Sequence, residues 1–257
     1  MKYYIADAFA EQHFKGNPAG VCILDEPLPD DIMQKIAAEN NFSETAFVLK
    51  NGEKYNLRWF TPTFEIDLCG HATLASAFIV MNFVEPNLFE VSFDTQSGEL
   101  VVRRRDDMYE MLFPERIPQK IEVTSEITEA LGFTPDELYS ERDLYAVLKN
   151  EAAVREYSPD FAKLQNLDKW LGIAVTAKGE KADFVSRFFC PELKTEDPVT
   201  GSAHSSLVPL WSKKLGKNVF IAEQLSQRGG RLYCERTEGN VKISGKAVLY
   251  LKGEINI

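Results

Sequence analysis

Apolar and polar residues alternate over many short stretches of this chain, a pattern that predicts strands. Residues 1–15 alternate in this way and lack the apolar block of a signal peptide, so they are expected to begin the fold. A helical period occurs over 31–40, where Ile32, Ile36 and Ala37 fall on one face, and an apolar strand is expected at 45–49. Residues 159–167 likewise precede an apolar strand at 172–177, so this order of elements occurs twice.

Two motifs also recur in a fixed order. The first, residues 58–62 (RWFTP), recurs at 187–191 as RFFCP, and each copy is followed by a glycine, Gly70 or Gly201, that is expected to open an apolar helix. The second, at 96–101, recurs at 227–233, each time as a turn that leads into an alternating strand. Such a duplication predicts two related α+β units. Two prolines bracket a polar turn at 114–118, so the halves are expected at 1–115 and 116–257, and the last strand could return to the first half.

The duplication suggests where a ligand would bind. Two facing copies would enclose a cleft, and each would point one helix N-terminus toward it. Because the N–H groups and the dipole of a helix N-terminus favour an anion, the paired ends suit a small substrate with a carboxylate. Gly70 and Gly201 would let that substrate approach the backbone closely.

Glu44 is the candidate base. It stands where a helix ends and an apolar strand begins, a position at which a carboxylate is usually solvated, and a surface role is the alternative. The second copy has Trp170-Leu171-Gly172 at roughly this place, so the shared fold does not require a carboxylate there. Beside an apolar strand the pKa of Glu44 is expected to rise toward neutrality, which suits a group that takes and returns a proton.

Polar residues surround both expected helix openings. His71 and Thr73 follow Gly70, and Asp197, Thr200 and Ser202 surround Gly201. Helix capping would explain each of them singly, whereas their matched positions favour two walls of one site. His71 could exchange a second proton or hold a carboxylate, since its ordinary pKa lies near working pH.

Two turn residues are further candidates. Asn17 falls in an expected turn at 16–20 and could face the cleft, and Arg228 at an expected hairpin tip could add positive charge, although the turns alone explain both. The candidate catalytic residues are therefore Glu44, His71 and Asp197, and the candidate substrate-binding residues are Asn17, Gly70, Thr73, Thr200, Gly201, Ser202 and Arg228.

The cysteines and histidines show no metal-ligand spacing. Four cysteines lie far apart without a C-x-x-C pair, which predicts reduced thiols, a cytoplasmic location and no structural metal. Cys69 could serve as a thiol base. A racemase that moves protons between two faces would need a second thiol opposite, but the matching position before Gly201 is Thr200, so Cys69 is interpreted as a small buried side chain. No nucleotide-binding glycine motif is present, and no cofactor is expected.

Charge and hydropathy exclude two classes of partner. The formal charge of -10 and the lack of a basic face argue against nucleic acid. The longest weakly polar stretch, 72–84, is too short for a membrane-spanning helix. With 44% apolar and 26% charged residues the chain is expected to be an ordinary soluble protein.

These motifs resemble those of the phenazine-biosynthesis (PhzF-like) isomerases, which share the diaminopimelate epimerase type of fold. The resemblance spans most of the chain in the family's order, and the matching segments are residues 16–21, 43–47, 58–62, 68–73, 196–203 and 227–230.

The resemblance implies a fold, a site and an assembly. Each half would be a mostly antiparallel roll of strands around a central helix, with the site between the halves and commonly a homodimer. Glu44 would be the acid/base that shuttles the proton, His71, Asp197 and Ser202 would match other polar site positions, and Gly70 and Gly201 would bind the anion through the backbone. Epimerases of this fold use two cysteines, and Thr200 in place of the second favours the carboxylate mechanism.

The expected activity is a cofactor-independent proton shift on a small cyclic, amino or hydroxy carboxylate. A racemase or dehydratase that uses Cys69 is the nearest alternative. A non-catalytic protein that binds a small ligand is another.

Overall fold

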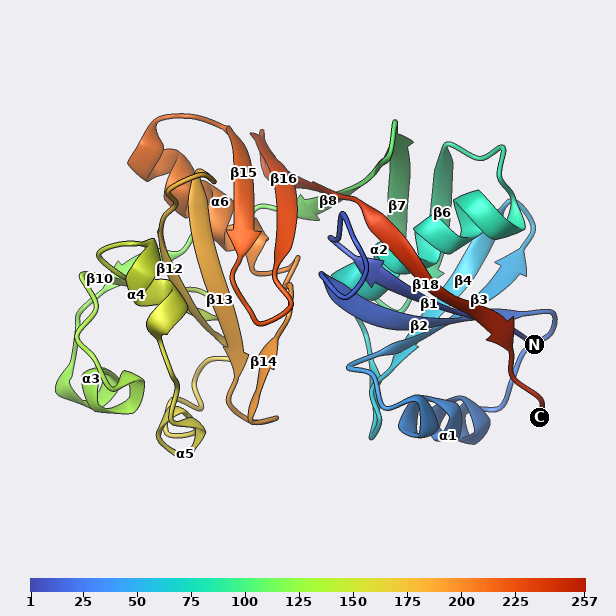
Figure 1. Ribbon diagram of the computed structural model, residues 1–257, viewed down its shortest axis with the longest axis horizontal. Coiled ribbons are helices and arrows are strands. Elements are labelled where there is room, and N and C mark those ends of the chain that lie inside the picture. The colour runs from blue at the N-terminus through green and yellow to red at the C-terminus, as the bar shows by residue number, and fades with distance from the viewer. The chain divides into compact units, whose positions relative to one another are not determined.

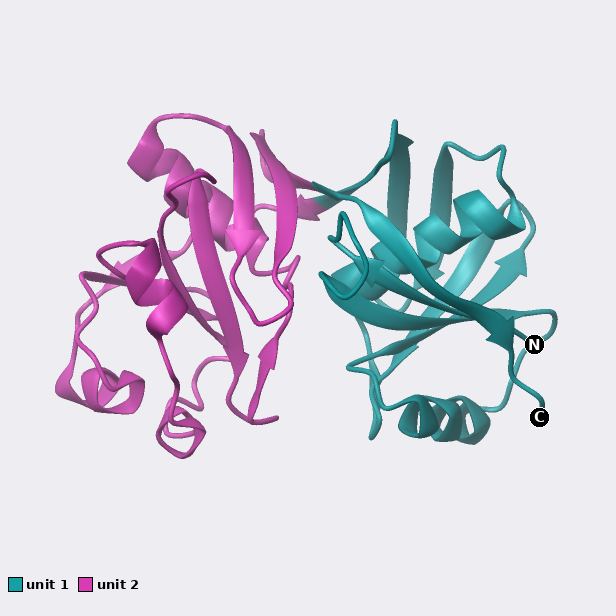
Figure 2. Ribbon diagram, in the orientation of Figure 1, with its two compact units in different colours: residues 1–112, 244–257 teal, residues 113–243 magenta.

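The computed structural model describes all residues, 1–257, and the chain divides into two compact units. Unit 1 comprises residues 1–112 and 244–257, and unit 2 comprises residues 113–243 (Figure 2). The last strand therefore returns to the unit in which the chain begins. There the terminal amino group donates to the carbonyl of Ile255 (2.9 Å), and the N–H of Ile255 donates to the carbonyl of Met1 (3.0 Å).

Unit 1 is a roll of strands with a helix, α2, packed against it (Figure 1). Most pairings are antiparallel (β1 with β18 and β2, β3 with β4, β6 with β7), and two are parallel, β2 with β3 and β4 with β6. Its elements are β1 (Lys2–Ala8), β2 (Asn17–Leu24), α1 (Asp30–Asn40), β3 (Thr45–Asn51), β4 (Lys54–Phe60), β5 (Glu65–Ile66), α2 (Gly70–Ile79), the π-helical turn η1 (Val80–Val84), β6 (Glu90–Thr95), β7 (Gly98–Arg105), β8 (Met108–Pro114, which crosses into unit 2) and β18 (Ala247–Glu254).

Unit 2 repeats this topology. The pair β10–β11 is antiparallel like β1–β2, β11–β12 is parallel like β2–β3, and β13–β15 is parallel like β4–β6. Its elements are β9 (Gln119–Ile121), α3 (Ser125–Leu131), β10 (Glu137–Ser140), β11 (Leu144–Val147), α4 (Glu151–Glu156), α5 (Phe161–Leu164), β12 (Ile173–Lys178), β13 (Phe184–Cys190), β14 (Thr195–Asp197), α6 (His204–Leu215), β15 (Val219–Gln224), β16 (Gly230–Thr237) and β17 (Asn240–Gly245, which ends in unit 1). The predicted fold class, two halves that are each a mostly antiparallel roll around a helix, is confirmed.

Matched hydrogen bonds show how the two copies correspond. Arg58 binds Glu65 through two N–H groups (2.6 and 2.7 Å), and Arg187 binds Glu196 in the same fork (2.7 and 2.9 Å). Each copy also has a serine in the turn before a strand. Its hydroxyl donates to the backbone carbonyl of the residue that lies two positions after this glutamate. These bonds are Ser97 to Asp67 (2.9 Å) and Ser226 to Pro198 (2.8 Å).

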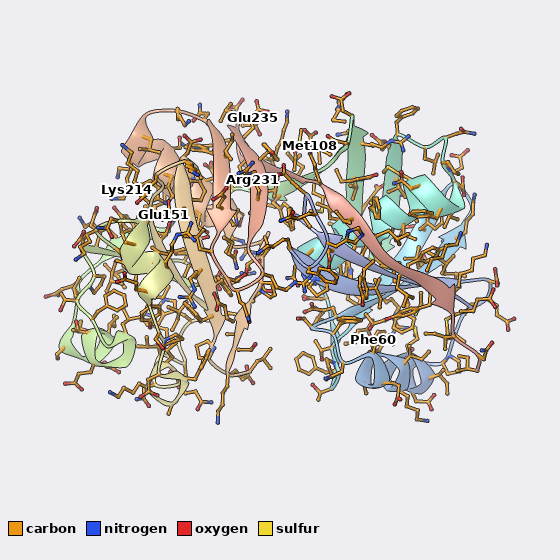
Figure 3. The ribbon with its side chains drawn as sticks, in the orientation of Figure 1. Phe60, Met108, Glu151, Lys214, Arg231 and Glu235 are labelled. Atoms are coloured by element: carbon orange, nitrogen blue, oxygen red, sulfur yellow. The ribbon has the colours of Figure 1, made fainter.

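The core of unit 1 lies on both faces of the strands. Helix α2 is buried on nearly every side because its residues are apolar or small all round, which is typical of a helix enclosed by a sheet. On the other face, Met33, Ile36 and Ala37 of α1 pack in one cluster with Phe47 and Phe60, and Figure 3 labels Phe60 next to α1. Phe47 and Phe60 meet edge to face with their ring centroids 5.5 Å apart.

Three predicted boundaries are wrong. The helix expected from Gly201 begins at His204, because residues 201–203 form a turn in which the N–H of His204 donates to the carbonyl of Gly201 (3.0 Å). Asn17 lies in strand β2, not in a turn, because residues 17–20 pair with β1, and the turn ends at Gly16 (φ +69°). Within 159–167 only Phe161–Leu164 is helical.

None of the helices is both long enough and apolar enough to cross a membrane.

Candidate functional site

Glu44 and His71 meet inside unit 1. Glu44 is the residue before β3, and His71 is the second residue of α2. The Oε2 atom of Glu44 lies 3.2 Å from Nε2 of His71, and their side chains are 17% and 7% exposed. A carboxylate and an imidazole at hydrogen-bond distance and nearly shielded from water can exchange a proton, so the alternative of a solvated surface role for Glu44 is wrong.

The other ring nitrogen of His71 faces the thiol of Cys69. Cys69 Sγ lies 3.5 Å from His71 Nδ1, and the side chain of Cys69 is buried, as the sequence predicted. One donor atom from each of Glu44, Cys69 and His71 lies within 4.8 Å of the others, and all three are of types that bind zinc. The imidazole, however, presents Nδ1 to the thiol and Nε2 to the carboxylate, so one ion could not use both contacts. The arrangement is better described as a row of three groups that carry protons.

Burial lowers the pKa of His71, and the nearby Glu44 carboxylate opposes that effect. The imidazole is therefore neutral at pH 7 and carries one N–H. Which nitrogen bears this proton depends on Glu44. An ionised carboxylate favours N–H at Nε2, whereas a protonated one would donate to Nε2. His71 can thus adapt to either form of its partner.

Neither central helix is capped by a side chain. Cys69 and Ala203 precede α2 and α6, and no side chain accepts a hydrogen bond from the first turn of either helix. The alternative that the polar residues at these openings are helix caps is therefore wrong. Thr73 is buried and its hydroxyl donates to the carbonyl of Cys69 (2.6 Å), so it could meet a substrate only as an acceptor.

The place of Glu44 is occupied by a glycine in unit 2. Thr45 pairs with Phe60 as Ile173 pairs with Phe189, so the residues before them, Glu44 and Gly172, correspond. A Cβ atom at residue 172 would lie 2.0 Å from Cζ of Phe188. Any side chain at this position would clash with the Phe188 ring unless that ring moved, and the carboxylate belongs to the first copy alone.

In unit 2 the residues around Gly201 are organised by a buried glutamine, Gln224, which is 1% exposed. Its Oε1 accepts from the N–H of Thr200 (2.9 Å), and its Nε2 donates to the carbonyl of Asp197 (2.7 Å) and to Thr200 Oγ1 (3.2 Å). Thr200 Oγ1 in turn donates to Oδ2 of Asp197. Because the hydroxyl accepts from Gln224, its only proton goes to Asp197, which is held as an acceptor.

Two more polar residues border the start of α6. The Nη2 group of Arg142 donates to Ser202 Oγ (3.2 Å). His204 is fully buried, and its Nδ1 lies 2.9 Å from the carbonyl of Thr200. Burial lowers the pKa of His204 to about 4, so this imidazole is neutral and supports the turn.

The structure groups the predicted residues within each unit. In unit 1 it brings Glu44 and His71 together beside Gly70, and in unit 2 it brings Asp197 and Thr200 together beside Gly201. Asn17 is buried on β2, and Arg228 lies in the turn between β15 and β16. Sequence reasoning missed Gln224 and Arg142. The strand pairing aligns Gln224 with Thr95 of the first copy, since Phe93 pairs with Tyr55 as Ala222 pairs with Phe184, and the sequence repeat alone did not show this difference.

The comparisons with known proteins agree with the fold and the motifs. Residues 6–253 match the family model described as phenazine biosynthesis-like protein. An uncharacterized isomerase of Pseudomonas aeruginosa is 47% identical, over 100% of this chain and 99% of that protein. A crystal structure of a putative PhzC/PhzF protein from Clostridium difficile has a TM-score of 0.98 and 54% identity over all of both chains, and one of a PhzF-family protein from Enterococcus faecalis has a TM-score of 0.97 and 50% identity over 100% and 99%.

The chain therefore belongs to the phenazine biosynthesis-like (PhzF) family. The predicted enzyme class, an isomerase, is confirmed at the level of these relatives, since those from Pseudomonas aeruginosa and Halalkalibacterium halodurans are named isomerases. More distant structures share the fold, among them a probable proline racemase with bound carbonate and a hydroxyproline epimerase with bound trans-4-hydroxy-L-proline (TM-scores 0.64 and 0.63, each 11% identical).

Proposed function

We propose that this protein is a cofactor-independent isomerase that moves a proton between two carbons of a small carboxylate, with Glu44 as the base. The buried pair of Glu44 and His71 carries this proposal, because a carboxylate held against a neutral imidazole can both accept and return a proton. The ligands named for the two distant neighbours, carbonate and hydroxyproline, are small molecules with a carboxylate-like group.

The reaction conserves all atoms. Glu44 removes a proton from a carbon next to a conjugating group, so the C–H bond breaks and its electron pair enters the conjugated system. The protonated Glu44 then delivers the proton to a second carbon of the same molecule. The electron pair of the double bond at that carbon forms the new C–H bond, and the double bond shifts toward the first carbon. Nε2 of His71 lies 3.2 Å from Oε2 of Glu44 without an aligned hydrogen bond, so a small turn of either side chain would let His71 bind this oxygen in both states and limit the reorganisation that each transfer requires.

The remaining site residues enter as substrate-binding groups. Asp197 is proposed to accept from an amine or hydroxyl of the substrate. Carboxylate binding is assigned to Ser202 and to the backbone at Gly70 and Gly201. Asn17, Thr73, Thr200 and Arg228 remain predicted contacts. A cytoplasmic location and a homodimer remain predictions as well.

Solvent isotope uptake tests the proposal. Amino and hydroxy cyclic carboxylates incubated with the protein in heavy water should incorporate deuterium at carbon, read by mass spectrometry and proton NMR. Glu44→Gln should abolish uptake and keep the thermal unfolding midpoint, whereas exposed Glu53→Gln should change neither. Wild-type uptake by Glu44→Gln would remove Glu44 from this role.

A second candidate is a thiol-based racemase or dehydratase, favoured by the contact of Cys69 Sγ with His71 Nδ1 (3.5 Å). Cys69→Ser separates the two functions. It should abolish uptake if the thiol is the base, and it should leave most of the uptake if Glu44 is.

A further inference from the structure

Arg142 is held rigidly in the turn between β10 and β11. Its N–H donates to Oε2 of Glu141 (2.5 Å), and its carbonyl accepts from the N–H of Leu171 (3.2 Å). With the backbone fixed on both sides and the side chain only 26% exposed, the guanidinium has little freedom. A rigid arginine loses little conformational entropy when it binds a ligand.

One edge of the guanidinium is occupied by the buried carboxylate of Asp143, which is 1% exposed. Nε of Arg142 lies 3.2 Å from both oxygens of Asp143, and Nη2 lies 2.7 Å from Oδ2. The hydroxyl of Tyr145 also donates to Oδ2 (3.2 Å). The ion pair lets a charged side chain sit inside the unit, but it leaves Nη1 of Arg142 without a partner in the protein.

Donor groups without acceptors gather around Ser202. Because Ser202 Oγ accepts from Arg142 Nη2, its own proton points elsewhere, and no protein atom accepts it. The backbone N–H groups of Gly201, Ser202 and Ala203 precede the first hydrogen bond of the α6 turn and have no protein acceptor either. These groups, together with Arg142 Nη1, form a region rich in donors and poor in acceptors, as a carboxylate requires.

The first copy lacks this arrangement. Gly20 pairs with Thr45 as Leu144 pairs with Ile173, so the counterpart of Arg142 is Pro18. The repeated fold alone therefore does not account for an arginine at this position.

We propose that Arg142, together with Ser202, binds the carboxylate of the substrate and thereby selects a carboxylate over an uncharged isostere. This inference deepens the proposed function and rests on a substrate that carries a carboxylate. Nη1 of Arg142 and the Ser202 hydroxyl each donate to an oxygen of the ligand, while Asp143 keeps the guanidinium in place.

A pair of isosteric probes tests the assignment. Isothermal titration calorimetry would compare 2-aminobenzoate with 2-aminobenzamide, which differ mainly in the charged group. The wild type should bind the carboxylate about tenfold or more tightly than the amide, since hydrogen bonds to charged groups contribute that much. The double variant Arg142→Met/Asp143→Asn, which leaves no buried charge unpaired, should lose this preference and bind the amide as before.

Asp143→Asn separates binding from a merely structural role. It keeps the guanidinium and removes its counter-charge, so the affinity for 2-aminobenzoate should stay the same or rise. If the ion pair had only a structural role, both this variant and the Arg142 double variant would bind 2-aminobenzoate more weakly. Arg155→Met/Glu151→Gln, which neutralises another pair of an arginine with a buried acid in the same unit, should leave both affinities unchanged.

The proposal is overturned if the wild type binds the two probes equally, if it binds no 2-aminobenzoate at millimolar concentration, or if the Arg142 double variant keeps the preference. The preference between the two probes is measured by equilibrium binding, so it does not depend on whether the proposed proton transfer is correct. Failure of isotope uptake would refute the proposed function alone.

Discussion

Phe188 closes off Gly172, the counterpart of Glu44 in the second copy of the fold. A Cβ atom at residue 172 would lie 2.0 Å from the end of the Phe188 ring. The two copies therefore differ at the position of the proposed base, and the packing of Phe188 accounts for the difference. The duplicated fold carries a single carboxylate of this kind.

Gly172→Ala should destabilise the protein by about 1–3 kcal/mol, because the new methyl group must displace a packed aromatic ring. Urea unfolding followed by fluorescence would measure this change. Gly253→Ala on β18 is the matched control, since its added methyl would meet only Leu251 at an ordinary 3.6 Å. Equal stability of the two variants would contradict the packing argument.

The neutral state of His71 predicts a pH dependence. Because burial lowers its pKa below the ordinary value, the imidazole gains its proton at a lower pH than an exposed histidine does. The loss of isotope uptake that comes from protonation of His71 should therefore occur at a lower pH than it would for an exposed histidine. His71→Asn should reduce uptake about 100-fold or more, by the usual contribution of a group that assists proton transfer. Uptake that rises as His71 becomes protonated would contradict this assignment.

Gln224 is predicted to position Asp197. Gln224→Leu keeps the approximate size of the side chain and leaves the N–H of Thr200 and the carbonyl of Asp197 without their partner, at a cost of about 1–3 kcal/mol for each group. If the variant folds, turnover should fall more than it does in exposed Gln165→Leu. Gln224→Glu, which keeps one acceptor oxygen for Thr200, should recover part of kcat. A variant that loses only stability would limit Gln224 to a structural role.

His204 should make the protein sensitive to acid. Its pKa in the folded state is about 4, against 6.5 when exposed, so the unfolded chain binds a proton first as the pH falls. The stabilisation is complete above pH 6.5 and is lost as the pH falls toward 4, by about 3 kcal/mol in total for a shift of this size. His204→Gln should flatten this part of the stability profile, measured by urea unfolding at several pH values. An unchanged profile would show that other groups control acid unfolding.

The repeat could be predicted from sequence because it depends on local features. The motif at 58–62 recurs at 187–191 since both arginines must reach a glutamate on the neighbouring strand, a requirement expressed over a few residues. Glu44 and His71 could be selected for the same reason, as polar residues at the ends of predictable elements. The start of α6 was less predictable, because residues 201–203 form a turn whose hydrogen bonds span three residues instead of four.

The sequence by itself determined the duplicated order of strands and helices, the family, and the polar residues next to each glycine, since periodicity and motif spacing are properties of neighbours along the chain. Only the tertiary structure decided that Glu44 contacts His71 across 27 residues, that Gln224 holds Thr200, and that Arg142 reaches Ser202 across 60. Those contacts depend on how strands pair and which side chains a buried core brings together. Pairing and burial are set by the whole fold, and no local segment encodes them.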